Sequence, residues 1–419
     1  MTKTIIILGT IVHCVQQNTI EIIENGFLLV SGNKIDALGD QTTYAELKKS
    51  NQSIDDDAEK IILKKNQILI PGLIDTHIHA PQYPNCGLGY DRPLLEWLDT
   101  YTYKLEKKYR DQDFSKKVFE AVVRKTLDHG TTTACYFASL FKNSSLILAE
   151  AAIKYGQRAL VGKINMTTFA PPDYVETPAD SIADTRKFIE DVKSMKNNLV
   201  QPIITPRFAL SVDMDLMRKL AEIAKNYDVH IQTHISENVD ELKLIQEKYG
   251  IPYAEVYDQA NLLTPKTVLA HGIYLTGEEI SLLAKRETSI AHCPDSNTCL
   301  KSGLYVAGGP SPSIVNAMKA ALDTSVHISF TQENYIPLTY IDAFYLATLG
   351  GAQALALDHV VGNLTAGKDF DALIVDMDVV NSSVDCLMEY TPAELLQKFV
   401  YHGDDRNIIN VFVGGKRVK

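Results

Sequence analysis

Hydrophobic and polar residues follow one pattern at the two ends of the chain and another in its middle. Both ends hold short apolar runs, rich in β-branched residues and separated by turn residues, which is typical of strands. The runs are TIIILGTIVHCV, GFLLVSGNKIDALG and EKIILKKNQILI at the start, and FDALIVD and NVFVGGKRV at the end. We therefore predict one small β-sandwich domain assembled from residues 1–70 and 360–419.

Residues 71–359 instead alternate between apolar, strand-like runs and amphipathic helical patterns such as MDLMRKLAEIAKNY and GEEISLLAKR. Such alternation predicts parallel strands that are buried on both faces. Seven strand-like runs can be counted, whereas a closed (β/α)8 barrel needs eight. The predicted fold is α/β, a (β/α)8 TIM-like barrel that lacks most of its eighth strand. The runs are ILIPGLIDTHIH, GTTTACYF, ALVGKINM, VQPIITPRF, VHIQTHISE, KTVLAHGIY and ETSIAHCP.

Polar residues fall at or just past the C-terminal ends of these runs, on the barrel face where barrel enzymes place their chemistry. They are Asp75, His77, His79, Arg207, His234, Glu237, His271 and His292. This regularity predicts a catalytic site at the C-terminal mouth of the barrel.

In DTHIHA, His77 and His79 are two positions apart, so on a strand their side chains point to the same face. Two imidazoles on one barrel wall can bind a single metal ion, and nitrogen ligands suit zinc. The alternative is that one histidine faces the barrel interior and the other packs in the core. The position directly after PGLID favours the ligand interpretation.

In QTHISEN, His234 ends the fifth strand and could complete the protein ligands of an open zinc site, and Glu237 follows in the loop. A carboxylate there could move protons to and from a water molecule at the metal. The alternative is that Glu237 only caps the following helix, in SENVDELKL. Beside the histidine pair, we favour catalysis.

His271, in LAHGIY, ends the sixth strand at a height from which it could contact the reacting water or the substrate. Its alternative is a hydrogen-bonded core histidine. His292, in AHCPDSN, is expected to order its loop and not to react.

Arg207 and Phe208 offer a planar cation and an aromatic face at the end of the fourth strand, and Gln82 adds an amide three residues after His79. Together they suit a flat polar heterocycle, by hydrogen bonding and stacking. The alternatives are an internal ion pair for Arg207 and a surface position for Gln82.

Composition narrows the class of protein. The 419 residues carry a net charge of -11, which argues against nucleic acid or an anionic membrane as partner. No apolar run approaches the roughly 18 residues of a membrane span, and the N-terminus is expected to form a strand and not a signal peptide. Unpaired cysteine spacing predicts reduced thiols and a cytoplasmic protein. The cysteines are Cys14, Cys86, Cys135, Cys293, Cys299 and Cys386.

Several longer blocks resemble the guanine deaminase family of the amidohydrolase superfamily, over essentially the whole chain. They are PGLIDTHIHAPQY, DRPLLEWLDTYTYKLE, TPRFALS, THISEN, AHGIYL, HCPDSN, AGGPSPS, LATLGGAQALAL and YHGDDRNI. DRPLLEWL and LATLGGAQAL are far more specific than the paired histidines.

The resemblance implies a zinc hydrolase of purine catabolism that converts guanine to xanthine and ammonia, with one Zn²⁺ per chain, as a homodimer. It implies that His77, His79 and His234 bind zinc, that Glu237 transfers protons and that His271 lies near the reacting water. It also implies that Gln82, Arg207 and Phe208 hold the purine.

One block of the family pattern is missing. The family has an aspartate that binds zinc, in a GTD sequence just ahead of VAGG, whereas here Leu304 and Tyr305 run directly into Val306 and Ala307. The chain is also shorter by roughly a helix and a strand, compared with a βαβ crossover of about 10–12 residues or more. We expect weaker zinc binding, with Asp295 as the nearest replacement carboxylate. A non-catalytic purine-binding or partner-binding protein and an aminohydrolase for another heterocycle remain as alternatives.

Overall fold

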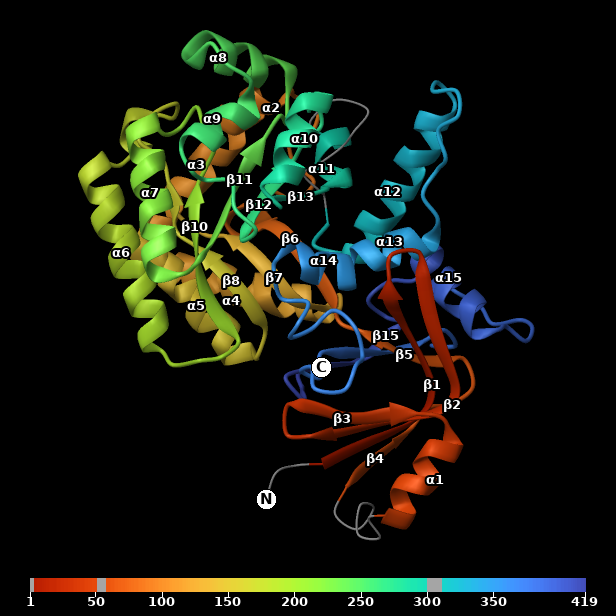
Figure 1. Cartoon of the computed structure of the whole chain (residues 1–419). Helices are drawn as coiled ribbons and strands as arrows, with labels where there is room; N and C mark the ends of the chain where they lie inside the picture. The colour runs from red at the N-terminus through yellow and green to blue at the C-terminus, as the bar shows by residue number, and fades with distance from the viewer. Residues whose placement is uncertain (1–3, 51–57, 300–310) are drawn as a thin grey trace.

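The computed structural model describes residues 4–50, 58–299 and 311–419. A seven-strand core of parallel β-strands surrounded by helices lies beside a mixed sheet built from both ends of the chain (Figure 1). Both parts were predicted from the hydrophobic pattern. The proposed domain limits at residues 70 and 360 stay a prediction.

Strands from the two ends of the chain form one eight-stranded mixed sheet in the order β16-β15-β14-β5-β1-β2-β3, with β4 paired to β1. A tight turn at Gly32 and Asn33 joins β2 to β3. The strands are β1 (Thr4–Gln16), β2 (Thr19–Ser31), β3 (Lys34–Gly39), β4 (Glu59–Ile62), β5 (Gln67–Pro71), β14 (Ala372–Asp376), β15 (Ile408–Val413) and β16 (Lys416–Arg417).

The parallel sheet runs in the order β13-β12-β11-β10-β8-β7-β6, with the short β9 paired to β10. Every residue of β7 and β11 is buried, as expected for strands covered on both faces. The strands are β6 (Leu73–His79), β7 (Thr131–Phe137), β8 (Arg158–Gly162), β9 (Ile164–Asn165), β10 (Val200–Pro206), β11 (His230–Ile235), β12 (Thr267–His271) and β13 (Ser289–Ala291).

The run ILIPGLIDTHIH was predicted as a single strand, which is wrong. It breaks at Gly72 into β5, which belongs to the mixed sheet, and β6, which begins the barrel. A Cβ at Gly72 would lie 2.0 Å from Thr132 Oγ1, so only glycine fits where the chain passes from one sheet to the other.

Most helices cover the outside of the barrel or close its ends, whereas those at residues 41–50 and 392–402 pack against strands of the mixed sheet. The two helical patterns quoted from the sequence are confirmed as α7 and α10. The helices are α1 (Gln41–Ser50), α2 (Leu94–Trp97), α3 (Tyr103–Glu106), α4 (Gln112–Asp128), α5 (Lys142–Tyr155), α6 (Pro178–Ser194), α7 (Met214–Tyr227), α8 (Val239–Tyr249), α9 (Tyr253–Gln259), α10 (Gly277–Lys285), α11 (Pro294–Cys299), α12 (Ile314–Ser329), α13 (Tyr340–Leu346), α14 (Leu349–Ala354) and α15 (Pro392–His402).

The barrel is not closed by strand pairing between β13 and β6. Within the described residues no strand bonds to the free edge of either one. Helix α14 packs against both strands instead, and the Ala347 carbonyl just before it accepts a hydrogen bond from the Ile74 N–H at 2.8 Å. A Cβ at Gly351 would already lie 3.1 Å from Ile74 Cβ, so a glycine allows this close approach.

A buried ion pair joins the barrel to the mixed sheet. Arg158, on β8, donates to Asp371 from Nε at 3.0 Å and to Asp369 from Nη2 at 2.8 Å. Asp371 Oδ1 also accepts the backbone N–H of Gly414 at 2.7 Å. The side chains of Arg158 and Asp371 are only 5% and 2% exposed, so each charge depends on the other for stabilisation.

Replacing Asp371 with alanine should lower the free energy of unfolding by about 3–5 kcal/mol, because it leaves Arg158 with a single carboxylate in a buried site. Urea unfolding followed by circular dichroism measures the change. As the control, Asp215→Ala removes an exposed carboxylate paired with Lys219 and should cost less than about 1 kcal/mol. Equal losses in both variants would contradict the assignment.

Candidate active site

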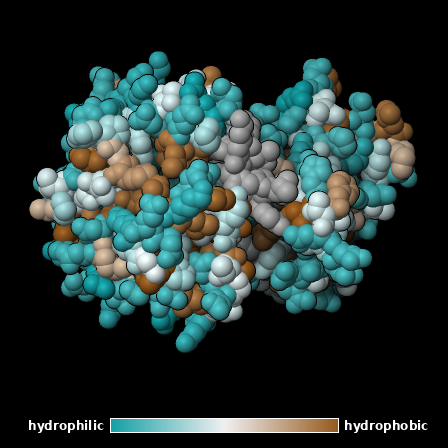
Figure 2. Space-filling view, turned by 90° about the horizontal axis from the view of Figure 1, so that it is seen from above, coloured by the Kyte–Doolittle hydropathy of each residue, from teal (hydrophilic) through white to brown (hydrophobic). Residues whose placement is uncertain are grey.

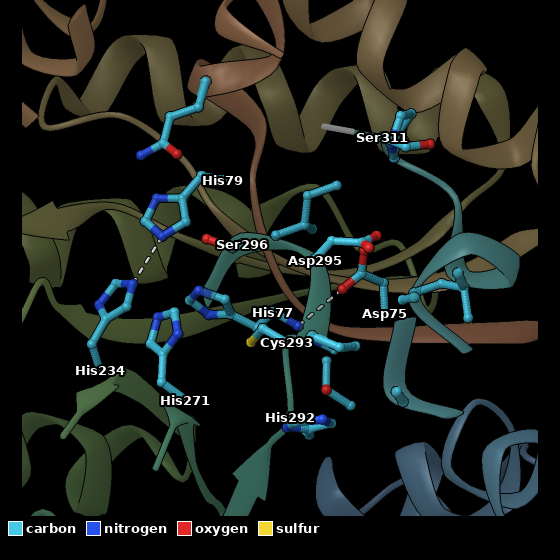
Figure 3. A pocket seen from close by; sticks show the side chains of 18 of the residues that line it. Asp75, His77, His79, His234, His271, His292, Cys293, Asp295, Ser296 and Ser311 are labelled. Atoms are coloured by element: carbon cyan, nitrogen blue, oxygen red, sulfur yellow. Dashed lines mark hydrogen bonds between the residues drawn. The ribbon is translucent and has the colours of Figure 1, made fainter. Parts of the chain in front are cut away.

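The paired histidines of β6 face the interior of the barrel mouth, as their spacing predicts. His77 and His79 line one cavity, and the backbone N–H of His77 donates to Asp75 Oδ1 at 3.1 Å. The imidazoles of His77, His79, His234 and His271 gather in one group in Figure 3. The core-packing alternative for one member of the pair is therefore wrong.

His234 is held in one orientation by the backbone. Its Nδ1 donates to the Arg207 carbonyl at 2.5 Å, which leaves the lone pair of Nε2 directed toward the other histidines. Nε2 of His234 lies 2.9 Å from Nε2 of His79 (Figure 3). A hydrogen bond donated by the other ring nitrogen to a backbone carbonyl is the usual way in which a histidine ligand is oriented toward a metal ion.

The donor atoms fit a metal ion such as zinc. The ligand nitrogens of His77, His234 and His271 lie within 4.8 Å of one another. Zinc–nitrogen bonds of about 2.0–2.1 Å in a tetrahedral site place two nitrogens about 3.3 Å apart, close to the separation of His79 and His234. The compact group of possible ligands is therefore His77, His234 and His271. It does not include His79, which the sequence analysis predicted as a ligand, although His79 Nε2 lies 2.9 Å from His234 Nε2.

Phe137, the last residue of β7, packs against the histidine group. Its ring is fully buried, and its centroid lies 5.0, 4.5 and 4.7 Å from the imidazole centroids of His77, His79 and His234. It limits the rotation of all three rings. The sequence analysis missed Phe137, although it ends a barrel strand at the same face as the polar residues.

Burial lowers the pKa of His77, His79 and His234 well below the ordinary value of 6.5, and the positive charge of neighbouring histidines lowers it further. The imidazoles are therefore neutral, the form that binds metals.

Zinc affinity should consequently change by less than about threefold between pH 8 and pH 6, measured by titration with a competing chelator. Three histidines of ordinary pKa would each be roughly one-quarter neutral at pH 6, and affinity would fall roughly 70-fold. A fall of that size would contradict the lowered pKa values.

Glu237 enters the cavity because the chain turns sharply after β11. Ser236 adopts a φ of +50°, and Asn238, not Glu237, caps helix α8. Glu241 completes the capping box and accepts the N–H of Glu237 at 2.9 Å. The capping alternative for Glu237 is therefore wrong.

Glu237 lies beside His271, with its Oε2 3.4 Å from the histidine Nε2. Burial raises the pKa of Glu237 well above its ordinary value, and the nearby Glu241 carboxylate raises it further. The raised pKa favours the protonated carboxyl group, which can donate a proton as a general acid. His271 holds a φ of +80°, a strained backbone conformation of the kind found at functional sites.

Arg207 and Gln82 meet at a buried carboxylate that the sequence analysis missed, Glu106. Arg207 makes a two-point ion pair with it, at 2.6 and 3.3 Å, and the Gln82 amide donates to it at 3.1 Å. The internal ion pair considered for Arg207 therefore exists, yet Arg207, Gln82 and Phe208 all line the cavity. The surface alternative for Gln82 is wrong.

The cavity has a volume of about 290 Å³ and combines the polar groups with an apolar wall. Its apolar lining includes Trp97, Leu94, Leu98 and Tyr90. Small and apolar residues of α12, α13 and α14 line the side where the barrel is not closed by a strand. A flat heterocycle fits such a space better than an extended ligand does.

The carboxyl groups of Asp75 and Asp295 lie to one side of the histidines (Figure 3). Burial raises the pKa of Asp75 to about 7 and that of Asp295 to about 6. Among the described residues, neither joins the group of ligand atoms within 4.8 Å, and neither does His292. The predicted gap between Leu304 and Ala307 lies outside the described residues.

Comparison with known proteins identifies the family. Residues 68–418 match the model of the amidohydrolase family. Guanine deaminase of Rattus norvegicus is 42% identical, over 98% of this chain and 95% of that protein. Guanine deaminase of Dictyostelium discoideum is 39% identical, over 98% and 97%. The chain belongs to the guanine deaminase family.

Solved guanine deaminase structures are similar throughout. That of C. acetobutylicum, which has guanine in its active site, is 31% identical, covers all of both chains and gives a TM-score of 0.90. The E. coli guanine deaminase gives 0.87 at 27% identity, over 100% of this chain and 99% of that one.

The match to the Dictyostelium guanine deaminase extends over 438 aligned positions, more than the 419 residues of this chain. The relative therefore contains residues that have no counterpart in this chain.

None of the helices in the described part of the chain has the length and apolar composition that crossing a membrane requires. The face in Figure 2 is mostly hydrophilic, with hydrophobic side chains scattered in small groups.

Proposed function

We propose that this chain binds one zinc ion and hydrolyses guanine to xanthine and ammonia. The observation that carries the proposal is the group of four imidazoles at the barrel mouth, with Glu237 and Arg207 lining the same cavity. His77, His79 and His234 hold the metal, and His271 lies beside it. When bound, zinc supplies Lewis acidity that activates water.

Glu237 carries protons in this reaction. It takes a proton from the attacking water and gives it to the purine, so that the C2–N bond can break. Water supplies the oxygen that appears at C2 of xanthine, and the amino group leaves as ammonia. The raised pKa of Glu237 makes its carboxylate a stronger base for the first of these steps.

Three side chains hold the base. Phe208 offers a ring face for stacking, and it is itself supported edge-on by Phe169 at a centroid distance of 5.7 Å. Arg207 donates hydrogen bonds to the edge of the base, and the Gln82 amide makes the remaining polar contacts there.

Incubating the purified chain with guanine and zinc, and measuring xanthine by chromatography, tests the proposal. Turnover supports it. The proposal is refuted if the folded, zinc-containing chain yields no xanthine. A panel of other aminated heterocycles, run alongside, tests the alternative of a different substrate.

A specific observation favours a second candidate, a purine-binding protein without turnover. Among the described residues, the group that could hold a metal contains histidines only, and no strand pairs with the free edge of β13 or β6. Binding of hypoxanthine together with zinc, without conversion of guanine, distinguishes this candidate.

We also propose a cytoplasmic homodimer, on the family resemblance, the cysteine pattern and the net charge. Light scattering of the purified chain measures the assembly, and a monomer at micromolar concentration would contradict it.

A further inference from the structure

A single buried carboxylate holds both polar side chains assigned to base recognition. Glu106, on α3, is 1% exposed and accepts four donors. Its Oε2 accepts Arg207 Nη1 at 2.6 Å and Tyr174 Oη at 2.9 Å, and its Oε1 accepts Gln82 Nε2 at 3.1 Å and Arg207 Nη2 at 3.3 Å. These bonds use the whole accepting capacity of an ionised carboxylate.

This arrangement fixes which way the Gln82 amide points. A carboxylate paired with a guanidinium can only accept, so Gln82 must turn its NH2 group toward Glu106. Its Oε1 is then left as an acceptor for a ligand in the cavity. Arg207 carries donors only, and Glu106 and the ring of Tyr103, 5.2 Å from the guanidinium carbon, hold it in place.

We propose that Glu106 is a positioning residue that selects a lactam, an N–H adjacent to a C=O, on the substrate ring. Gln82 Oε1 accepts the lactam N–H, and Arg207 donates to the lactam oxygen. The inference rests on the proposed function in one respect, that the ligand is a purine. Guanine carries a lactam at N1 and C6. Without the Glu106 charge, Gln82 can flip and Arg207 loses its direction.

Hypoxanthine and purine form a matched pair for the test, because they differ only by the lactam. Neither has an amino group at C2, so affinity can be measured by calorimetry on the zinc-supplied chain whether or not it turns over guanine. Trp97, the only tryptophan, lines the cavity and gives a second readout by fluorescence.

The unsubstituted chain should bind hypoxanthine about 10- to 100-fold more tightly than purine, as expected for two added hydrogen bonds. Glu106→Gln should lower this ratio at least about tenfold, by weakening hypoxanthine binding and leaving purine binding nearly unchanged.

Glu279→Gln is the matched control. Glu279 is also a buried glutamate, 5% exposed, but it accepts the N–H of Ala254 and that of Thr276 away from the cavity. This variant should keep the ratio of the unsubstituted chain. A substitution that only loosens the fold would weaken the binding of both ligands by the same factor. If Glu106→Gln has that effect, the proposal is overturned.

If Glu106→Gln does not fold, Glu106→Asp takes its place. It keeps the charge for Arg207 but draws the carboxylate back by about 1.5 Å, one carbon–carbon bond. The ratio should then fall at least about threefold. An unchanged ratio in a folded variant, or equal binding of both compounds by the unsubstituted chain, overturns the proposal. A chain without guanine turnover that still shows the loss of ratio would refute the proposed function alone.

Discussion

Glu237→Gln should reduce kcat for xanthine formation by roughly 100- to 10,000-fold, the range expected when a general acid–base group is lost. Glutamine keeps the shape of the side chain but cannot exchange a proton. Because Glu237 is outside the imidazole group, zinc content should stay at that of the unsubstituted chain. Steady-state kinetics and metal analysis on the same preparations measure both quantities.

Glu279→Gln again provides the comparison, since it makes the same chemical change in a buried glutamate far from the reacting atoms. It should keep kcat within about twofold. If Glu237→Gln retained kcat to a similar degree, the role of proton carrier would have to pass to another group, with His271 as the nearest candidate.

His234→Ala should weaken zinc binding by at least about 100-fold, since even the loss of an outer partner of a ligand costs 10- to 100-fold. A hydrogen bond from its Nδ1 to the Arg207 carbonyl orients the His234 ring, and its Nε2 lies 2.9 Å from that of His79. Metal analysis after dialysis should give about one zinc for the unsubstituted chain and nearly none for the variant.

His292→Ala is the matched control, because His292 lines the same cavity but lies outside the group of candidate ligands. It should retain its zinc. Equal loss of zinc from both variants would mean that the metal site is not the one proposed here.

The sequence predicted the helices and strands in which the spacing of apolar residues stays regular from one end of the element to the other. Helix α7 coincides with MDLMRKLAEIAKNY, because its apolar residues recur at helical spacing and Asp213 caps it. The strand ends that bear His234 and His271 were also placed correctly. The break at Gly72 was missed, because β5 and β6 are equally apolar and only the tertiary structure assigns them to different sheets.

The candidate site was predicted in part for a similar reason. Histidines and arginine at strand ends stand out against apolar strands, whereas Glu106 lies among lysines in YKLEKKY and resembles a solvated charge. Its importance comes from Arg207, 101 residues later in the chain, which brings a positive charge to the same buried position. No local pattern contains that information.

The hydrogen bond from the Ile74 N–H to the Ala347 carbonyl has a consequence for local unfolding of the barrel. Among the described strands, β6 pairs with β7 alone, so the strand that carries His77 and His79 is an edge strand, and helix packing supports its other side. Edge strands open at lower free energy than strands paired on both sides. A metal ion held between β6 and β11 would act as a crosslink across the barrel and raise the free energy of that local opening. Amide hydrogen exchange in β6 should therefore report metal binding more sensitively than global unfolding does.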